Sequence, residues 1–278
     1  MEKLIETNEV FLAEQVPHDQ MRLAFLDLTD SIKKWRLLSY LGWNDIRMRY
    51  RGSVLGPLWI TASMLIFIGA FSIVYSRLFH QTLTEYVPFL TVGYLVWLFI
   101  SSVLIESCNI YVDAASFITE FKLPYTMYVF RLIWRHFLIF LHNSIVYLLV
   151  VIYFKVSINW TIIFAVPGLM LVMLNLASIS LLLSIMGAKY RDIPQVVVSI
   201  IQIAFFITPI SWSPGLLKNS LIITLNPFNY FIDLVRSPLL GQMPSLASWV
   251  VSLTLTMVVS FFSFVLFARF RRNIPFWL

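Results

Sequence analysis

Six long apolar stretches constrain this chain of 278 residues more than any other feature. A helix that crosses a bilayer needs about 20 apolar residues, and each stretch has about that length. The predicted spans are residues 54–75, 88–107, 127–154, 161–186, 194–212 and 246–267. A soluble domain could not bury them, because 59% of the residues are hydrophobic and only 12% are charged. The sequence therefore predicts an all-α polytopic membrane protein with six transmembrane helices.

The basic residues between these spans indicate an orientation. If both termini are cytoplasmic, 16 of the 20 lysines and arginines lie on the inner side and 4 on the outer side. Because basic residues collect at cytoplasmic helix ends, this distribution predicts cytoplasmic termini. The net charge of +6 therefore reflects topology and does not indicate nucleic-acid binding.

Two segments precede the first span, and residues 31–278 as a whole are predicted to form the transmembrane domain. Residues 1–30 begin with a strongly acidic stretch, unlike a secretory signal, and are predicted to form a cytosolic arm. Residues 31–49 can place Trp35 and Trp43 on one apolar side, with basic flanks. This pattern predicts an amphipathic helix in the membrane interface. A soluble helix packed on a partner is the alternative.

Two connections also have unusual compositions. Residues 213–245 are apolar, but four prolines and Gly241 interrupt them, so short re-entrant helices on the outer side are expected. The inner loop at residues 117–124 combines apolar and charged residues before a proline. It is either a solvated turn or a short cytosolic helix that docks a soluble motor subunit.

Motifs of enzymes are missing from the sequence. No glycine-rich phosphate loop ends in Gly-Lys-Ser or Gly-Lys-Thr, so the chain is not expected to hydrolyse ATP. The four histidines are scattered and Cys108 is the single cysteine, so no metal site is expected. Arg131 and Arg135 share a helix face near the inner end of the third span. They either snorkel to the cytosol or contact an anionic headgroup or a cytosolic partner.

Several short motifs resemble one transporter family. RYRGSVLGPLW at residues 49–59 is similar to the start of the first span in membrane subunits of polysaccharide-exporting ABC transporters. KYRDIP at residues 189–194, Thr208-Pro209-Ile210, Asn226-Pro227-Phe228 and the final Phe-Trp-Leu resemble further motifs of these proteins. The resemblance covers roughly residues 35–278 and is to the permease subunits of O-antigen exporters and their kin, the teichoic-acid and capsule exporters.

The resemblance implies a homodimer in the bacterial inner membrane that pairs with two copies of a separate ATP-binding subunit. ATP and Mg²⁺ would bind to that subunit, and this chain would hold no cofactor. The implied substrate is a long glycan on a polyprenyl diphosphate lipid. Residues 213–245 would form an outer gate, and the inner loop would be a coupling helix. The residues expected to couple to the ATPase are Phe117, Glu120, Phe121, Lys122 and Pro124.

A glycan channel suits aromatic walls, because sugar rings slide along aromatic faces without strong directional bonds. The channel candidates are Tyr50, Trp59, Phe67, Phe71, Tyr75, Trp97, Phe99, Phe205, Phe206, Trp212, Phe228 and Tyr230. Arg47, Arg49 and Arg51 are expected to meet the lipid diphosphate at the inner entrance, or else only to set topology. An ABC permease for a drug or small lipid is the alternative function. A lipid-modifying transferase would need clustered polar catalytic residues, which the sequence does not show.

Overall fold

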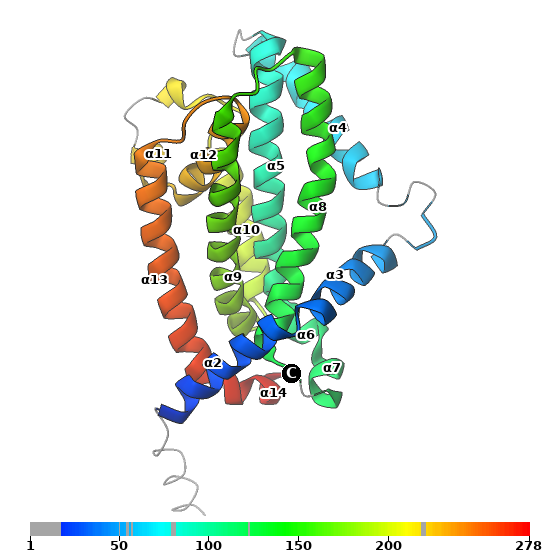
Figure 1. Ribbon diagram of the computed structural model, residues 1–278, viewed down its shortest axis with the longest axis vertical. Coiled ribbons are helices and arrows are strands. Elements are labelled where there is room, and N and C mark those ends of the chain that lie inside the picture. Colours follow the sequence, from blue (N-terminus) through cyan, green and yellow to red (C-terminus); the bar gives the residue numbers. More distant parts are fainter. Residues whose placement is uncertain are drawn as a thin grey trace, which may run out of the picture.

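The computed structural model describes residues 18–49, 51–53, 56, 58–78, 82–121, 123–217 and 221–278. All regular structure in these ranges is helical, which confirms the all-α class. The elements are α2 (His18–Lys33), α3 (Trp35–Arg49), α4 (Leu58–Leu78), α5 (Leu83–Ser107), α6 (Ile110–Asp113), α7 (Ala115–Glu120), α8 (Tyr125–Phe154), η1 (Trp160–Phe164), α9 (Ala165–Lys189), α10 (Ile193–Ile207), η2 (Pro214–Leu217), α11 (Leu221–Leu225), α12 (Pro227–Leu239), α13 (Leu246–Phe270), η3 (Arg271–Asn273) and α14 (Ile274–Trp277). Figure 1 shows α5, α8, α9 and α13 running along the long axis of the molecule.

Five helical segments among the described residues are long and apolar enough to cross a membrane. They are Leu58–Leu78, Leu83–Ser107, Tyr125–Phe154, Trp160–Lys189 and Leu246–Trp277. These segments coincide with the first four predicted spans and the last one, although most begin or end a few residues away. The chain is therefore a multi-pass membrane protein.

The predicted fifth span, residues 194–212, corresponds to the shorter helix α10. Its 15 residues extend about 22 Å, against a hydrocarbon thickness of about 30 Å. The helix ends at Ile207 because Thr208 precedes Pro209, and a residue before proline disfavours helical geometry. Thr208 accordingly has an extended backbone, with ψ of 135°. By length, then, the described chain has five spanning helices and one shorter apolar helix.

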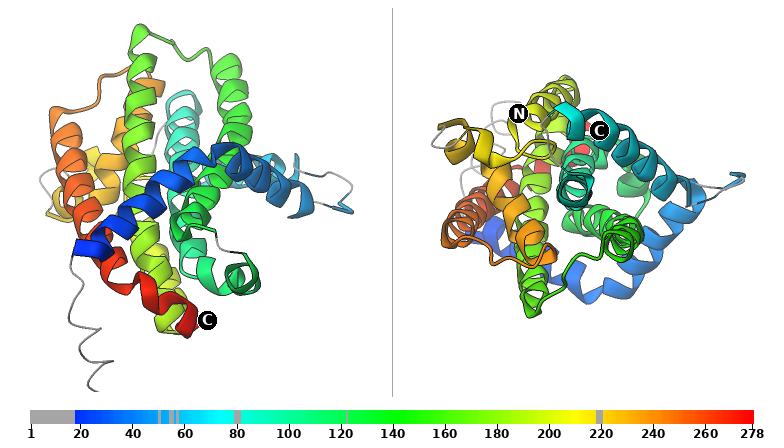
Figure 2. Two further views of the ribbon diagram at one scale, coloured as in Figure 1. Left: turned by 60° about the horizontal axis from the view of Figure 1, so that its bottom comes forward. Right: turned by 90° about the horizontal axis from the view of Figure 1, so that it is seen from above.

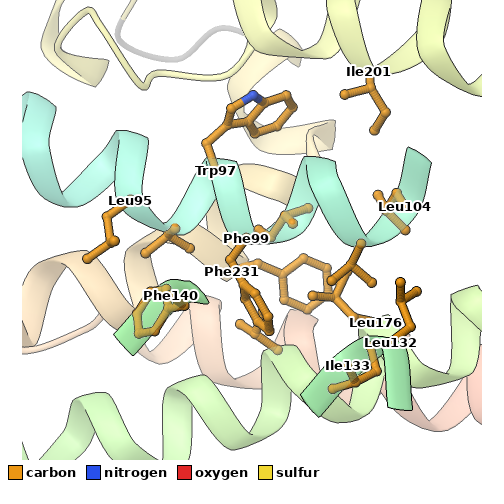
Figure 3. Close-up of a cluster of buried hydrophobic side chains, with 14 of the residues drawn as sticks. Leu95, Trp97, Phe99, Leu104, Leu132, Ile133, Phe140, Leu176, Ile201 and Phe231 are labelled. Carbon is orange, nitrogen blue, oxygen red and sulfur yellow. The ribbon is translucent and has the colours of Figure 1, made fainter. Parts of the chain in front are cut away.

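Helix α5 lies at the centre of the bundle and is the most buried of the five long helices. It contacts α4, α8, α9, α10 and α12. Figure 3 shows Phe99 of α5 among core side chains from neighbouring helices, while Trp97 extends from the opposite side of α5. The predicted second span began at Pro88, but α5 begins at Leu83, so Pro88 lies inside the helix.

Close backbone contacts hold two of the helices in place. A β-carbon at Gly187 of α9 would lie 1.9 Å from the carbonyl oxygen of Cys108, so this approach requires glycine. A β-carbon at Gly42 of α3 would lie 2.9 Å from the Trp134 side chain of α8. Leu38, Gly42 and Ile46 form the buried stripe of α3, at intervals of four residues.

Helices α2 and α3 run obliquely across the lower half of the upright helices (Figure 1, and Figure 2, left). Asp27 of α2 is buried and accepts hydrogen bonds from the backbone N–H groups of Tyr125 (3.1 Å) and Thr126 (2.9 Å). It therefore caps the first turn of α8. Arg271 Nε also donates to Asp27, at 3.1 Å. Part of the predicted arm at residues 1–30 thus belongs to α2, and residues 1–17 lie outside the described residues.

One end of the molecule carries α2, α3, α7 and α14, together with the end of α9 (Figure 1). We call it the basic end, after its lysines and arginines. They include Arg47, Arg49, Lys189, Arg191, Arg269 and Arg271.

Candidate functional site

Seven of the twelve aromatic channel candidates lie together in one strip, which we call the aromatic ladder. With Tyr94, the ladder comprises Phe67, Phe71, Tyr75, Tyr94, Trp97, Phe205, Phe206 and Phe228. On α4, the rings of Phe67 and Phe71 stack with centroids 4.1 Å apart. Phe71 and Tyr75 stack at 5.0 Å. The spacing of four residues brings these rings to one face of α4.

The ladder continues from α4 across three further helices. Phe67 stacks on Tyr94 of α5 with ring centroids 3.8 Å apart. Phe205 of α10 lies 6.5 Å from Phe67 and 5.9 Å from Trp97. Phe228 of α12 meets Trp97 edge to face at 5.5 Å. Most of these rings are partly exposed, so the ladder forms a nearly continuous aromatic strip of uncharged side chains.

Three other candidates lie apart from the ladder. Phe99 is 3% exposed and packs against Phe140 of α8 at 5.6 Å, so it is a core residue. Trp59 is exposed near the start of α4 and contributes to a separate cleft, described below. Tyr50 lies outside the described residues.

The turn that follows α10 is held by side-chain donors from three directions. Tyr86 of α5 donates to the Ser211 carbonyl at 2.8 Å. The amide of Asn226 donates to the Thr208 hydroxyl at 2.9 Å. Arg236 of α12 is buried and donates to the Pro209 carbonyl at 2.6 Å. Two of the motifs noted in the sequence, Thr-Pro-Ile and Asn-Pro-Phe, are thereby in direct contact.

The last two channel candidates lie beside this turn. Trp212 Nε1 donates to the Phe206 carbonyl at 3.1 Å. The Tyr230 hydroxyl donates to the Thr224 carbonyl at 2.7 Å. Both side chains therefore stabilise the segment between α10 and α12, and neither has a ring contact with the ladder among those described.

A cluster of ionised side chains joins three helices at the basic end. Arg131 of α8 pairs with Asp45 of α3, and its Nε donates to Asp45 at 2.7 Å. Arg135 pairs with Glu106 at the end of α5, and it also lies 3.6 Å from Asp45. Arg49 Nη2 donates to Glu106 at 3.1 Å. The two arginines of α8 thus bind carboxylates of the same chain, a role that the sequence alone did not suggest.

The three arginines expected at the entrance differ in their surroundings. All three are exposed, but Arg49 is also paired with Glu106. With Arg131 and Arg135, the cluster holds three guanidinium groups against the two carboxylates of Asp45 and Glu106. Asp113 borders the same cluster and supplies a third carboxylate.

Two clefts flank this cluster. One, of about 350 Å³, opens toward α6 and is lined by Asp45, Arg131 and Asp113. Partial burial and the Glu106 carboxylate raise the pKa of the Asp113 carboxyl above its ordinary value. The other, of about 280 Å³, lies between α4, α5 and α8, and both Arg49 and Glu106 contribute to its wall.

Helix α7 contains the first four residues of the predicted coupling segment, residues 117–124. Phe117 and Phe121 are 53% and 52% exposed, and their rings stack with centroids 6.0 Å apart. Glu120 is exposed on the same helix, Pro124 is the N-cap of α8, and Lys122 lies outside the described residues. A cleft of about 500 Å³ separates this segment from α2. The basic end therefore presents two aromatic rings beside a hollow.

The remaining sequence motifs also meet in space. Lys189 Nζ lies over the rings of Tyr190 (4.9 Å), Phe270 (5.6 Å) and Trp277 (5.7 Å). Such cation–π contacts tie the end of α9 to the last residues of the chain. The KYRDIP motif and the C-terminal Phe-Trp-Leu thus belong to one structural unit.

Comparison with known proteins adds independent information. The sequence model of the family described as "ABC-2 type transporter" matches residues 36–240. An "O-antigen export system permease protein RfbA" from Klebsiella pneumoniae is 26% identical over 191 residues, which are 66% of this chain and 72% of that protein. A protein of the same name from Myxococcus xanthus is 23% identical over 200 residues, covering 69% of this chain and 75% of that protein.

Proposed function

Because this chain belongs to the ABC-2 type transporter family, we propose that it is the transmembrane subunit of an ATP-driven exporter of lipid-linked polysaccharide. The substrate is an O-antigen-like glycan on polyprenyl diphosphate, and it crosses the bacterial inner membrane. The chain forms the channel as a homodimer, with two separate subunits that bind ATP and Mg²⁺. The names of its relatives support this substrate class. The chain itself is a transport subunit and not an enzyme.

The aromatic ladder is the observation that most favours a glycan as the substrate. A transported polymer must be guided along its length and released at every step. Flat aromatic rings offer large apolar contacts to the faces of sugar rings, with little directional bonding. Charged groups would instead form strong hydrogen bonds that hold each sugar in place.

The basic end supports an assignment of orientation and partner. Its excess of lysines and arginines favours the cytoplasmic side of the membrane. The exposed pair Phe117 and Phe121 then faces the cytosol, where α7 docks on the ATP-binding subunit. Arg47, Arg49 and Arg51 lie at the level where the diphosphate of the lipid carrier arrives.

The opposite end supports a gate. Helices α11 and α12 lie in the half of the molecule opposite α2 and α14 (Figure 1). Helix α12 packs against α5, α9 and α13, and Phe228 at its start touches Trp97 of the ladder. A movement of α12 would therefore change the width of the aromatic passage.

The test is deletion of the gene, followed by detection of the glycan with antibodies in intact and permeabilised cells. Export predicts that the polymer disappears from the surface and accumulates inside on its lipid carrier. Unchanged surface glycan would refute the assignment and favour a permease for a drug or a small lipid. The deletion strain is then complemented with Phe71→Leu or with the core variant Phe267→Leu. Less surface glycan with Phe71→Leu than with Phe267→Leu would show that the ladder takes part in export.

A further inference from the structure

The cleft between α4, α5 and α8 contains a buried amide with an unused acceptor. Asn143 of α8 is 3% exposed and lines this cleft. Its Oδ1 atom has no hydrogen-bond partner within the described part of the chain. A buried carbonyl oxygen without a partner costs about 1–3 kcal/mol, so a ligand that donates a hydrogen bond to Asn143 recovers this cost.

The cleft joins this amide to an ion pair and to aromatic rings. His136 and Asn143 are seven residues apart on α8, which places them on one face, about 10 Å from each other along the axis. The His136 end holds the ion pair of Arg49 and Glu106, and the Arg49 side chain is 44% exposed, so it has donors left for a ligand. Trp59 and Tyr94 line other parts of the wall, and Tyr94 also stacks on Phe67 of the ladder.

This arrangement matches a ligand with a phosphate at one end and a donor-bearing sugar at the other. The Arg49 guanidinium suits a phosphate oxygen. An amide oxygen needs a donor, which a sugar hydroxyl or an acetamido N–H provides. The volume of about 280 Å³ suits one sugar and not a polymer.

We propose that this cleft binds the first sugar of the lipid-linked glycan, the one attached to the diphosphate. Asn143 accepts a hydrogen bond from that sugar, while Arg49 holds the phosphate. The inference rests on the proposed function and adds to it a binding site that recognises the sugar linked to the lipid diphosphate. Through Tyr94, the site leads directly to the aromatic ladder.

The test measures binding to the full chain in lipid nanodiscs by native mass spectrometry. The probes are polyprenyl diphosphate with one N-acetylamino sugar and bare polyprenyl diphosphate, against a background of phosphatidylglycerol. We expect the sugar-bearing probe to bind about tenfold more tightly than the bare probe, as one hydrogen bond to a buried group permits. Asn143→Leu should remove this difference in affinity, and Arg49→Gln should weaken the binding of both probes.

A matched control separates binding from folding. Asn175 of α9 is also buried, but its Nδ2 donates to Thr256 at 3.3 Å. Asn175→Leu should therefore lower the melting temperature and keep the preference for the sugar. Asn143→Leu should keep or raise the melting temperature, because it removes an unpaired polar atom. If Asn143→Leu does not accumulate, Asn143→Ala serves the same purpose with less bulk.

The possible outcomes are distinct. Equal binding of the two probes by the unmodified chain, or an unchanged preference in Asn143→Leu, would overturn the sugar site and leave the export function intact. Failure of the unmodified chain to bind either probe above the phosphatidylglycerol background would contradict the lipid carrier, and with it the proposed function.

Discussion

The two sides of the bundle are built from different side chains. Between α9 and α13, small polar residues form a buried seam: Asn175 donates to Thr256, and Ser263 donates to the Ser178 carbonyl at 2.7 Å. Small residues of this kind allow helices to approach closely in a membrane. On the other side, α4 and α10 meet α5 through the partly exposed rings of the aromatic ladder. The seam fixes two helices to each other, whereas the ladder leaves most of its rings partly exposed.

A bulky residue in the seam should have the largest effect on stability. Ser263 is 1% exposed, so Ser263→Leu must force α9 and α13 apart and also leaves the Ser178 carbonyl without its donor. We expect a loss of about 3 kcal/mol in the free energy of unfolding. Denaturation of the purified protein in detergent measures it. Ser263→Ala, which adds no bulk, should cost about 1 kcal/mol. Equal losses for the two variants would show that the helices are not closely packed here.

The next largest effect is expected at the basic end, where the two sides meet. Glu106→Gln removes the carboxylate that Arg49 and Arg135 share, while Arg135 stays largely buried. We expect the free energy of unfolding to fall by about 2–3 kcal/mol. This is less than for most fully buried pairs, because Glu106 is partly exposed. The double variant Glu106→Gln with Arg135→Gln should recover part of this loss, because no buried charge is then left unpaired. Strict additivity of the two single losses would contradict the pairing.

A substitution in the ladder should reduce transport more than it reduces the stability of the fold. Phe71→Leu keeps an apolar side chain but removes the flat ring between Phe67 and Tyr75. The free energy of unfolding should change by less than about 1.5 kcal/mol. The amount of glycan on the cell surface should nevertheless fall several-fold, because the aromatic ladder is interrupted. Phe267→Leu, in the buried end of α13 where the ring is 0% exposed, provides the comparison. It should lower stability at least as much, with surface glycan close to normal per folded molecule.

The sequence was informative where local rules decide the structure. Length and hydropathy located five of the long helices within a few residues. The early end of α10 was also readable, because Thr208 precedes Pro209, yet hydropathy alone extended the span to residue 212. Tyr94 lies three residues before Trp97 on the same helix, so helical spacing could have added it to the channel candidates.

Such local rules could not predict contacts between residues that are far apart in the sequence. Arg131 lies 86 residues from Asp45, and nothing local identifies that carboxylate as its partner. The same holds for Asp27, which caps α8 across 98 residues. Phe99 and Trp97 were equivalent as sequence candidates, although only Trp97 joins the ladder. Tertiary packing decides which face of α5 meets which neighbour.

The smallest effect on stability is expected at α7, which belongs to neither side of the bundle. Phe117 and Phe121 are about half exposed, so the double variant Phe117→Ser with Phe121→Ser should change the free energy of unfolding by less than about 1 kcal/mol. Stimulation of ATP hydrolysis by the glycolipid should be lost in the complex with the ATP-binding subunit, because the docking contact is removed. Phe276→Ser, at a ring that is 86% exposed at the same end, controls for a general loss of apolar surface. If both variants reduce stimulation equally, the docking surface extends beyond α7 to the C-terminal residues, and coupling cannot be assigned to α7 alone.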